Sequence, residues 1–308
     1  MKQNRLREAI ARATQSLIDA GVASPHVDAR LIAAHLLDVP PTQLVLAEVP
    51  DGAEVPDGVD GADGADGADG LDSWGGFEKT YAALVARRAS REPLQHILGT
   101  APFGVHDLKV GPGVFIPRPE TEVLAEWAVN QKPTGTVVDL GTGSGALAIY
   151  IAQRAQPERV IGVEKSPVAR EAAEANAAPF PSVQIIAGDM TDPELLVELS
   201  GTVDLVVANP PYVPYVPREA GELEPEVYHD PEDAVFSGAD GMETIRGLIP
   251  VAARLLAPGG KLGIEHDDTT AELTRRLVEA DGSFEDVRNL ADLTGRDRFV
   301  TASKLSTN

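Results

Sequence analysis

Four consecutive residues, Asn209, Pro210, Pro211 and Tyr212, carry the most specific chemical signal in this sequence of 308 residues. They follow the apolar run 205–208, so a polar amide enters the loop at the point where a buried strand would end. The two prolines fix consecutive φ angles and remove two backbone donors, which leaves nearby carbonyl groups aimed as acceptors. The side-chain oxygen of Asn209 and the carbonyl of Pro210 could each accept one N–H of an NH2 group, while Tyr212 packs against the planar substrate. The motif therefore predicts a site that turns the lone pair of an amide or aromatic amine toward an incoming methyl group.

Catalysis at such a site needs mainly positioning, because the nitrogen becomes acidic as it bonds to the methyl group and no strong base is required. Asn209, Pro210 and Tyr212 are the candidate catalytic residues, and together with Pro211 they are also candidate substrate-binding residues. The alternative is an irregular strand-to-loop exit in which Tyr212 is a core aromatic residue.

A glycine-rich loop upstream of this motif is a candidate cofactor site. Its three glycines alternate with two hydroxyl residues directly after the apolar run 136–140. Glycine lets a backbone turn sharply and approach a ligand closely. The spacing is G-x-G-x-G, whereas the dinucleotide fingerprint carries its third glycine one residue later. The candidate cofactor-binding residues around this loop are Asp139, Gly141, Thr142, Gly143, Ser144 and Gly145.

Acidic residues stand at the ends of the next two apolar runs. Glu164 lies 23 residues after Gly141, where a carboxylate could accept hydrogen bonds from both hydroxyls of a ribose. Asp189 and Met190 follow the third run, where an acid and an apolar side chain could receive the edge and the face of an adenine. This set fits an adenosyl group, and the residues alone leave both S-adenosylmethionine and NAD open.

The elements that must position these residues alternate between strand and helix. Apolar runs predict strands at 136–140, 160–164, 183–187, 203–208 and 261–265, and amphipathic segments predict helices at 166–177 and 242–256. This alternation predicts a doubly wound parallel sheet that is covered on both faces. Ligands of such sheets bind beyond the carboxyl ends of the strands, which is where the glycine loop, Glu164 and Asn209 stand.

The first part of the chain predicts a small helical bundle. Apolar residues recur at helical spacing between Leu6 and Ala20, and a second helix is expected to begin after a Ser24 cap. Further helices are expected at 42–47 and 77–89. Residues 100–119 are rich in Gly, Pro and Val and indicate a short hairpin.

A low-complexity acidic segment interrupts this bundle. From about residue 50 to 72 the chain nearly lacks large apolar residues, and Gly-Ala-Asp occurs three times in succession. Such a segment cannot bury enough surface to offset its ordering entropy, which predicts a flexible, solvated loop. A calcium-binding repeat is the alternative, but the repeat lacks the bulky apolar position that stacks such coils.

Composition excludes several classes of protein. The 48 acidic residues exceed the 26 basic ones, so the net charge is −22 and a phosphate backbone would be repelled. Because the chain has no cysteine, it can form no disulfide, thiolate metal site or cysteine nucleophile. No apolar stretch approaches the roughly 18 residues that span a bilayer. Since no secretory signal is evident, we expect a cytoplasmic protein that binds neither membranes nor nucleic acid directly.

Several longer segments resemble the PrmC/HemK family of S-adenosylmethionine-dependent release factor methyltransferases, and the resemblance runs nearly end to end. Besides the glycine loop and the tetrapeptide 209–212, they are EPLQHILG at 92–99, FIPRPETE at 115–122, SGADG at 237–241, LAPGG at 256–260 and DLTGRDR at 292–298. The tetrapeptide is shared with DNA adenine and guanine-amine methyltransferases. The PRPETE segment is far more particular to this family.

The resemblance implies an α/β fold with a Rossmann-like, seven-stranded class I methyltransferase domain at 120–308. A β-hairpin linker at 91–119 would join it to a substrate-docking helical bundle at 1–90. The implied cofactor is S-adenosyl-L-methionine, with S-adenosyl-L-homocysteine as product. The implied substrate is a class-1 peptide chain release factor, methylated on the side-chain amide (N5) of the glutamine in its Gly-Gly-Gln tripeptide.

Site residues can be carried over from the family position by position. Residues 141–145, Glu164, Met190 and Asn209 would meet the cofactor. The tetrapeptide would hold the glutamine, and Phe103 resembles a family aromatic residue that lines its pocket. Two features depart from the family pattern, namely the Gly-Ala-Asp insertion and Glu164 where many members have aspartate. Nothing in the sequence demands more than a monomer.

Several other polar residues admit two interpretations. The six histidines show no metal-ligand spacing, so no metal site is expected, and His266 is expected to support the site rather than act as a base. Arg118 could pair with Glu120 and shape the cofactor pocket, or the two could form an exposed linker pair. Arg298 could meet an acidic partner or form a strand-end salt bridge with Asp292 or Asp297.

Protein glutamine methylation is the leading functional hypothesis. The runner-up is a nucleic-acid methyltransferase, because the tetrapeptide can equally hold an adenine or guanine amine, but no basic groove or target-recognition region is evident. The glycine spacing argues against an NAD-dependent oxidoreductase. The intact tetrapeptide argues against a catalytically silent cofactor-binding adaptor.

Overall fold

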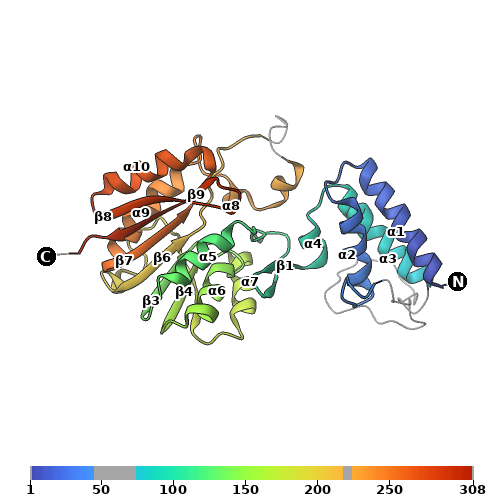
Figure 1. Cartoon of the computed structure of the whole chain (residues 1–308), viewed down its shortest axis with the longest axis horizontal. Coiled ribbons are helices and arrows are strands. Elements are labelled where there is room, and N and C mark those ends of the chain that lie inside the picture. Colours follow the sequence, from blue (N-terminus) through green and yellow to red (C-terminus); the bar gives the residue numbers. More distant parts are fainter. Residues whose placement is uncertain (1, 45–73, 218–223, 307–308) are drawn as a thin grey trace. The chain divides into compact units, whose positions relative to one another are not determined.

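The computed structural model describes residues 2–44, 74–217 and 224–306, and the chain divides into two compact units, residues 1–100 and 101–308 (Figure 1). The expected Gly-Ala-Asp loop at 50–72 lies outside the described residues. None of the helices in the described ranges is long and apolar enough to cross a membrane.

The first unit is a helical bundle. Its helices are α1 (Lys2–Asp19), α2 (Pro25–Leu36), α3 (Trp74–Ala89) and α4 (Leu94–Leu98). Their apolar faces enclose one core that contains the fully buried Leu17, Ile32 and Phe77. A buried ion pair joins α3 to α2, with Arg88 Nε 2.7 Å from Asp28 Oδ2.

The second unit contains a hairpin and a seven-stranded sheet. The hairpin pairs β1 (Thr100–Phe103) with β2 (His106–Lys109). The sheet order is β5-β4-β3-β6-β7-β9-β8. Its strands are β3 (Thr136–Leu140), β4 (Arg159–Glu164), β5 (Val183–Ala187), β6 (Val203–Ala208), β7 (Leu256–Glu265), β8 (Phe284–Ala291) and β9 (Asp297–Lys304). Strands β3 to β7 pair in parallel, and β9 runs antiparallel to both of its neighbours.

Helices cover both faces of this sheet. They are α5 (Thr121–Asn130), α6 (Ala146–Ala155), α7 (Pro167–Ala177), α9 (Glu243–Leu255) and α10 (Ala271–Asp281). The short α8 (Glu232–Val235) stands in the segment between β6 and α9. Neighbouring residues of a strand point to opposite faces. Val137 therefore joins the core that α5 and α6 cover, while Val138 joins the core that α9 covers. Burial on both faces explains why the central strands are continuous apolar runs in the sequence.

Most of these elements agree with the sequence-based expectations. The predicted strands at 136–140, 183–187 and 203–208 coincide with β3, β5 and β6. The five predicted strands pair in parallel as expected. The residue pattern did not predict β8 and β9, whose short connection joins antiparallel strands at one edge of the sheet.

Two helix predictions differ in detail. Ser24 precedes α2 as expected, but its hydroxyl donates to Asp28 Oδ1 at 2.7 Å and caps no backbone N–H. Residues 41–44 form a turn, and the remainder of the helix expected at 42–47 lies outside the described residues.

Candidate active site

A cavity of about 1110 Å³ lies in the second unit, beyond the carboxyl ends of β3, β4, β5 and β6. The parallel strands deliver to its wall most of the site residues expected from the sequence, namely Gly141, Thr142, Gly143, Ser144, Glu164, Asp189, Met190, Asn209 and Pro211. The expected residues that do not line it are Phe103, Asp139, Gly145, Pro210 and Tyr212.

The glycine loop bends because its backbone enters the left-handed region, with φ of 80° at Gly141, 56° at Gly143 and 87° at Gly145. A Cβ at Gly141 would collide with the end of the Met190 side chain, whereas a Cβ at Gly143 would meet nothing within 4 Å. The backbone at Gly143 therefore lies open to the cavity, as a loop that binds a ligand through its backbone requires.

Glu164, at the end of β4, is held in place by backbone donors. Its Oε2 accepts from Gly143 N and its Oε1 accepts from Ser166 N, both at 2.8 Å. Burial raises the pKa of Glu164, and the bonds from these N–H groups oppose that rise. Each carboxylate oxygen keeps a further lone pair, so Glu164 can still accept hydroxyl donors from a ligand in the cavity.

Asp189 and Met190 follow β5. Asp189 Oδ1 accepts from Thr191 N at 2.9 Å and from the Thr191 hydroxyl at 2.7 Å, and its Oδ2 lies 3.0 Å from Lys165 Nζ. The Thr191 hydroxyl and Lys165 lower the pKa of Asp189, so the side chain is an anion. Lys165 also lines the cavity, although no pattern in the sequence singled it out.

Asp139 lies beneath the glycine loop, 1% exposed. Thr142 Oγ1 donates to its Oδ2 at 2.6 Å, and burial raises the pKa of Asp139 to about 7. In this position Asp139 shapes the loop from below, and the loop residues form the surface that a cofactor would meet.

Both ends of the tetrapeptide 209–212 are tied to one buried carboxyl group. Asn209 Nδ2 donates to Thr121 Oγ1 at 3.2 Å, and the Thr121 side chain adjoins Glu265 and lowers the pKa of that carboxyl. Tyr212 Oη donates to Glu265 Oε1 at 3.2 Å. Burial raises the pKa of the Tyr212 phenol, so it remains a donor. Pro210 is buried behind the wall that Asn209 lines.

Aromatic residues of the linker segment lie in two different environments. Phe103 is 2% exposed in the core and meets Tyr150 edge-on, with ring centroids 5.8 Å apart. Phe115 lines the cavity, and the Arg118 guanidinium lies 5.1 Å from its ring centroid. Arg118 Nη2 pairs with Asp230 Oδ2 at 2.6 Å, in place of the expected pair with Glu120. Because this partner is 112 residues away along the chain, local spacing could not reveal it.

Other polar residues of the described chain take structural positions. Arg298 Nε lies 3.0 Å from Asp292 Oδ2, which is the expected strand-end salt bridge. His266 is fully buried, its Nδ1 lies 2.9 Å from the carbonyl oxygen of Asp267, and it does not line the cavity. Within the described ranges, no group of three or more His, Asp or Glu side chains could hold a metal ion.

One part of the cavity wall carried no signal in the sequence. Residues 231–234 and Phe236 close the cavity from the segment after β6, together with Glu243, Thr244 and Gly247. The SGADG segment lies between these two groups, so a family motif could have drawn attention to the region, but no residue type in it predicts a ligand contact.

Comparison with known proteins matches both units. A methyltransferase domain model matches residues 137–229, and a model of the PrmC N-terminal domain matches residues 8–50. The release factor glutamine methyltransferase of Corynebacterium glutamicum is 52% identical, over 97% of this chain and 99% of that protein. The protein of the same name from Mycolicibacterium smegmatis is 50% identical, over 98% of this chain and 99% of its own length.

Solved structures agree on the fold. The crystal structure of the hMettl16 catalytic domain in complex with MAT2A 3'UTR hairpin 6 matches with a TM-score of 0.50. The match covers 74% of this chain and 82% of that one. At 13% identity it supports the class I methyltransferase fold and nothing finer.

Proposed function

The chain belongs to the release factor glutamine methyltransferase family, and from that premise we propose that it methylates the side-chain amide nitrogen of the glutamine in the Gly-Gly-Gln tripeptide of class-1 peptide chain release factors. It is a methyltransferase of the α/β class I fold. We further propose that it works as a cytoplasmic monomer on a protein substrate.

The cavity has the donor and acceptor groups that S-adenosylmethionine requires. In this proposal Glu164 accepts the ribose hydroxyls, Asp189 and Met190 receive the edge and the face of the adenine, and the open backbone at Gly143 allows close approach. Asp139 supports the glycine loop from beneath. When bound, the cofactor supplies an electrophilic methyl group on a sulfonium sulfur.

The tetrapeptide then orients the acceptor nitrogen. Asn209 Oδ1 and the Pro210 carbonyl accept the two N–H groups of the glutamine amide, and Tyr212 supports the tetrapeptide from behind the cavity wall. Holding both N–H groups turns the nitrogen so that its lone pair faces the methyl donor. No strong base is needed, because the nitrogen becomes acidic as the new bond forms.

The observation that carries this proposal is the common wall of one cavity. Asn209 lines the same cavity as Gly143 and Glu164, so an amide held by Asn209 would lie within the site that an adenosyl cofactor would fill. Two residues that the proposal assigns to the substrate, Phe103 and Tyr212, act from behind this wall.

A nucleic-acid acceptor remains the chemical alternative, because the tetrapeptide is suited to any planar NH2 group. The net charge of −22 opposes it, and Lys165 is the single cationic side chain on the described cavity wall. A protein substrate does not carry that electrostatic cost.

The test uses S-adenosylmethionine with a labelled methyl group. The purified protein is offered a release factor, the same release factor with its tripeptide glutamine replaced by alanine, and duplex DNA. We expect label in the unaltered release factor alone. Label in DNA would show that the tetrapeptide had been interpreted correctly but assigned the wrong acceptor.

A further inference from the structure

A buried carboxyl group behind the cavity wall has no role in the proposed methyl transfer. Glu265 ends β7 and is 2% exposed, and it does not line the cavity. Tyr212 Oη donates to its Oε1 at 3.2 Å, and the Thr121 hydroxyl adjoins the carboxyl and lowers its pKa. Its second oxygen, Oε2, is buried without a hydrogen-bond partner. A buried carboxyl group with one oxygen left without a hydrogen bond lowers the stability of the fold. Its presence at the end of a central strand therefore suggests a role other than stability.

The Thr121 hydroxyl connects this carboxyl to the cavity. A hydroxyl has one proton to donate and two lone pairs to accept with. Asn209 Nδ2 donates to the hydroxyl oxygen at 3.2 Å, which leaves the Thr121 proton for another acceptor, and we infer that this acceptor is the adjoining Glu265, whose pKa Thr121 lowers. Thr121 lines the cavity and is itself 3% exposed, so the hydroxyl stands at the wall between the buried carboxyl and Asn209.

The direction of these bonds decides which end of the Asn209 amide faces the substrate. An asparagine side chain presents an acceptor oxygen on one side and a donor NH2 on the other. With Nδ2 directed to Thr121, Oδ1 is the end left for the cavity. The opposite orientation would place an N–H group against the N–H groups of the glutamine amide and repel them.

We propose that Glu265 is a positioning residue that fixes the side-chain amide of Asn209, through the Thr121 hydroxyl, with its acceptor oxygen toward the methyl-accepting nitrogen. The Tyr212 hydroxyl shares the same carboxyl, so one buried group sets both ends of the tetrapeptide 209–212. This inference rests on the proposed function, since the acceptor must be a group with two N–H donors. We call this chain of bonds from Glu265 through Thr121 to Asn209 the relay. It needs an acceptor oxygen at Glu265, which the acid, its anion and a glutamine side chain all supply.

Four substitutions test the relay. Glu265→Met removes the acceptor oxygen, Thr121→Val removes the hydroxyl, and the double variant removes both. Glu265→Gln keeps one acceptor oxygen. Glu272→Gln on the exposed face of α10 serves as the control for a charge loss elsewhere in the second unit. The measurements are kcat and KM for methylation of a release factor, the dissociation constant for S-adenosylmethionine and the melting temperature.

We expect Glu265→Met and Thr121→Val each to lower kcat by ~10- to 100-fold, because a misplaced holding group costs about that much. Affinity for S-adenosylmethionine should stay within about twofold of the wild-type value in each variant. The kcat of the double variant should be no lower than that of the less active single variant, because both substitutions break the same chain of bonds. Glu265→Gln should lower kcat much less than Glu265→Met does. Additive losses, or equal losses in the two Glu265 variants, would overturn the relay. If Glu265→Met fails to fold, Thr121→Val compared with Thr121→Ser gives the same test.

A second measurement separates the relay from the proposed function. The side-chain NH2 signals of Asn209 can be observed by NMR in the protein without any methyl acceptor, and assigned by their loss in Asn209→Asp. The relay predicts that they shift in Thr121→Val and Glu265→Met and stay in place in Glu272→Gln. If they do not shift, the relay is wrong even where the wild-type protein methylates release factors. If they shift but no release factor is methylated, the relay stands and the proposed function falls.

Discussion

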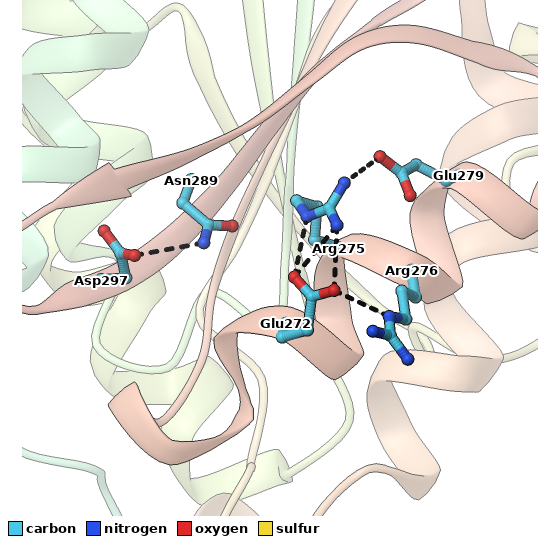
Figure 2. Close-up of polar contacts among 6 residues, drawn as sticks. All are labelled: Glu272, Arg275, Arg276, Glu279, Asn289 and Asp297. Atoms are coloured by element: carbon cyan, nitrogen blue, oxygen red, sulfur yellow. Dashed lines mark hydrogen bonds and ion pairs between the residues drawn. The ribbon is translucent and has the colours of Figure 1, made fainter.

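Two glutamates of the second unit show how differently the same side chain can be used. Glu265 is buried at the end of β7, accepts a bond from the neutral hydroxyl of Tyr212 and adjoins that of Thr121. Glu272 stands exposed in the first turn of α10, between the guanidinium groups of Arg275 and Arg276. Figure 2 shows this second group of side chains, where Arg275 also reaches Glu279.

The exposed network has more contacts and full opposite charges. Glu272 Oε1 lies 2.7 Å from Arg276 Nε and 3.0 Å from Arg275 Nη2, and hydrogen bonds from these arginines lower the pKa of Glu272. Water and salt screen such pairs, so their net value is small. The buried carboxyl makes fewer hydrogen bonds, but water has little access to replace them. The effect of a polar group on stability and activity is therefore decided by its burial and by the direction of its hydrogen bonds. The number of its contacts does not decide it.

Asn209→Ala should have the largest effect, because it removes the acceptor that the buried relay positions. We expect kcat to fall by ~100- to 1000-fold, the cost of deleting one preorganised hydrogen-bonding group at a reacting centre. The release factor assay measures this at saturating S-adenosylmethionine, with melting temperature as the control. A loss of less than about tenfold would mean that Asn209 does not hold the acceptor amide.

Asp28→Ala extends the comparison to the first unit. It removes the carboxylate partner of the buried Arg88 guanidinium, which keeps its bond to the Glu92 carbonyl, so we expect the free energy of unfolding to fall by about 3 kcal/mol. Chemical denaturation measures the change, with the exposed pair Arg12–Glu78 as a matched control through Glu78→Gln. Equal effects of the two substitutions would contradict the claim that burial makes an ion pair costly to break.

The pH dependence of stability probes Glu265 alone. Burial raises its pKa from 4.5 to about 7, so in the folded state it binds a proton that the unfolded chain releases between these values. Stability contributed by this group therefore falls as pH rises through that window. Relative to Glu265→Gln, which cannot titrate there, the wild-type protein should lose about 2 kcal/mol of unfolding free energy between pH 5 and pH 7. A constant difference between the two proteins would show that Glu265 titrates normally.

Glu272→Gln should have the smallest effect. Because Glu272 is exposed, we expect no measurable change in melting temperature at moderate salt and none in kcat. A destabilisation as large as that of Asp28→Ala would contradict the claim that an exposed ion pair contributes little to stability.

The sequence predicted much of the fold because burial leaves a pattern in it. Strands β3 and β6 are buried on both faces and appear as apolar runs with the observed bounds. The edge strand β5 is only half-buried, and its mainly apolar residues still predicted its bounds. Strand β8 is mostly exposed and interleaves charged residues with apolar ones, so it carries no such run. The antiparallel edge of the sheet was therefore missed from the residue pattern, although the family resemblance implies seven strands.

The candidate site was predictable where one short motif carries the chemistry. The glycine loop, Glu164 and Asn209 each follow a strand, and parallel strands bring their ends together. Contacts between distant segments were not predictable. Asp230 pairs with Arg118 across 112 residues, and Thr121 joins Asn209 across 88. Glu265 gave no signal, because its partners come from two other elements.

The position of the transferred methyl group tests the central claim most directly. A release factor labelled by this protein is hydrolysed in strong acid, which cleaves the side-chain amide bond of glutamine. If the amide nitrogen received the methyl group, the label is released as methylamine, and the Gln→Ala release factor releases none. Label recovered as methanol would indicate a carboxylate acceptor, and label retained on an amino acid would indicate another nitrogen or a carbon. Either of these results would contradict a site built to hold an NH2 group between Asn209 and Pro210.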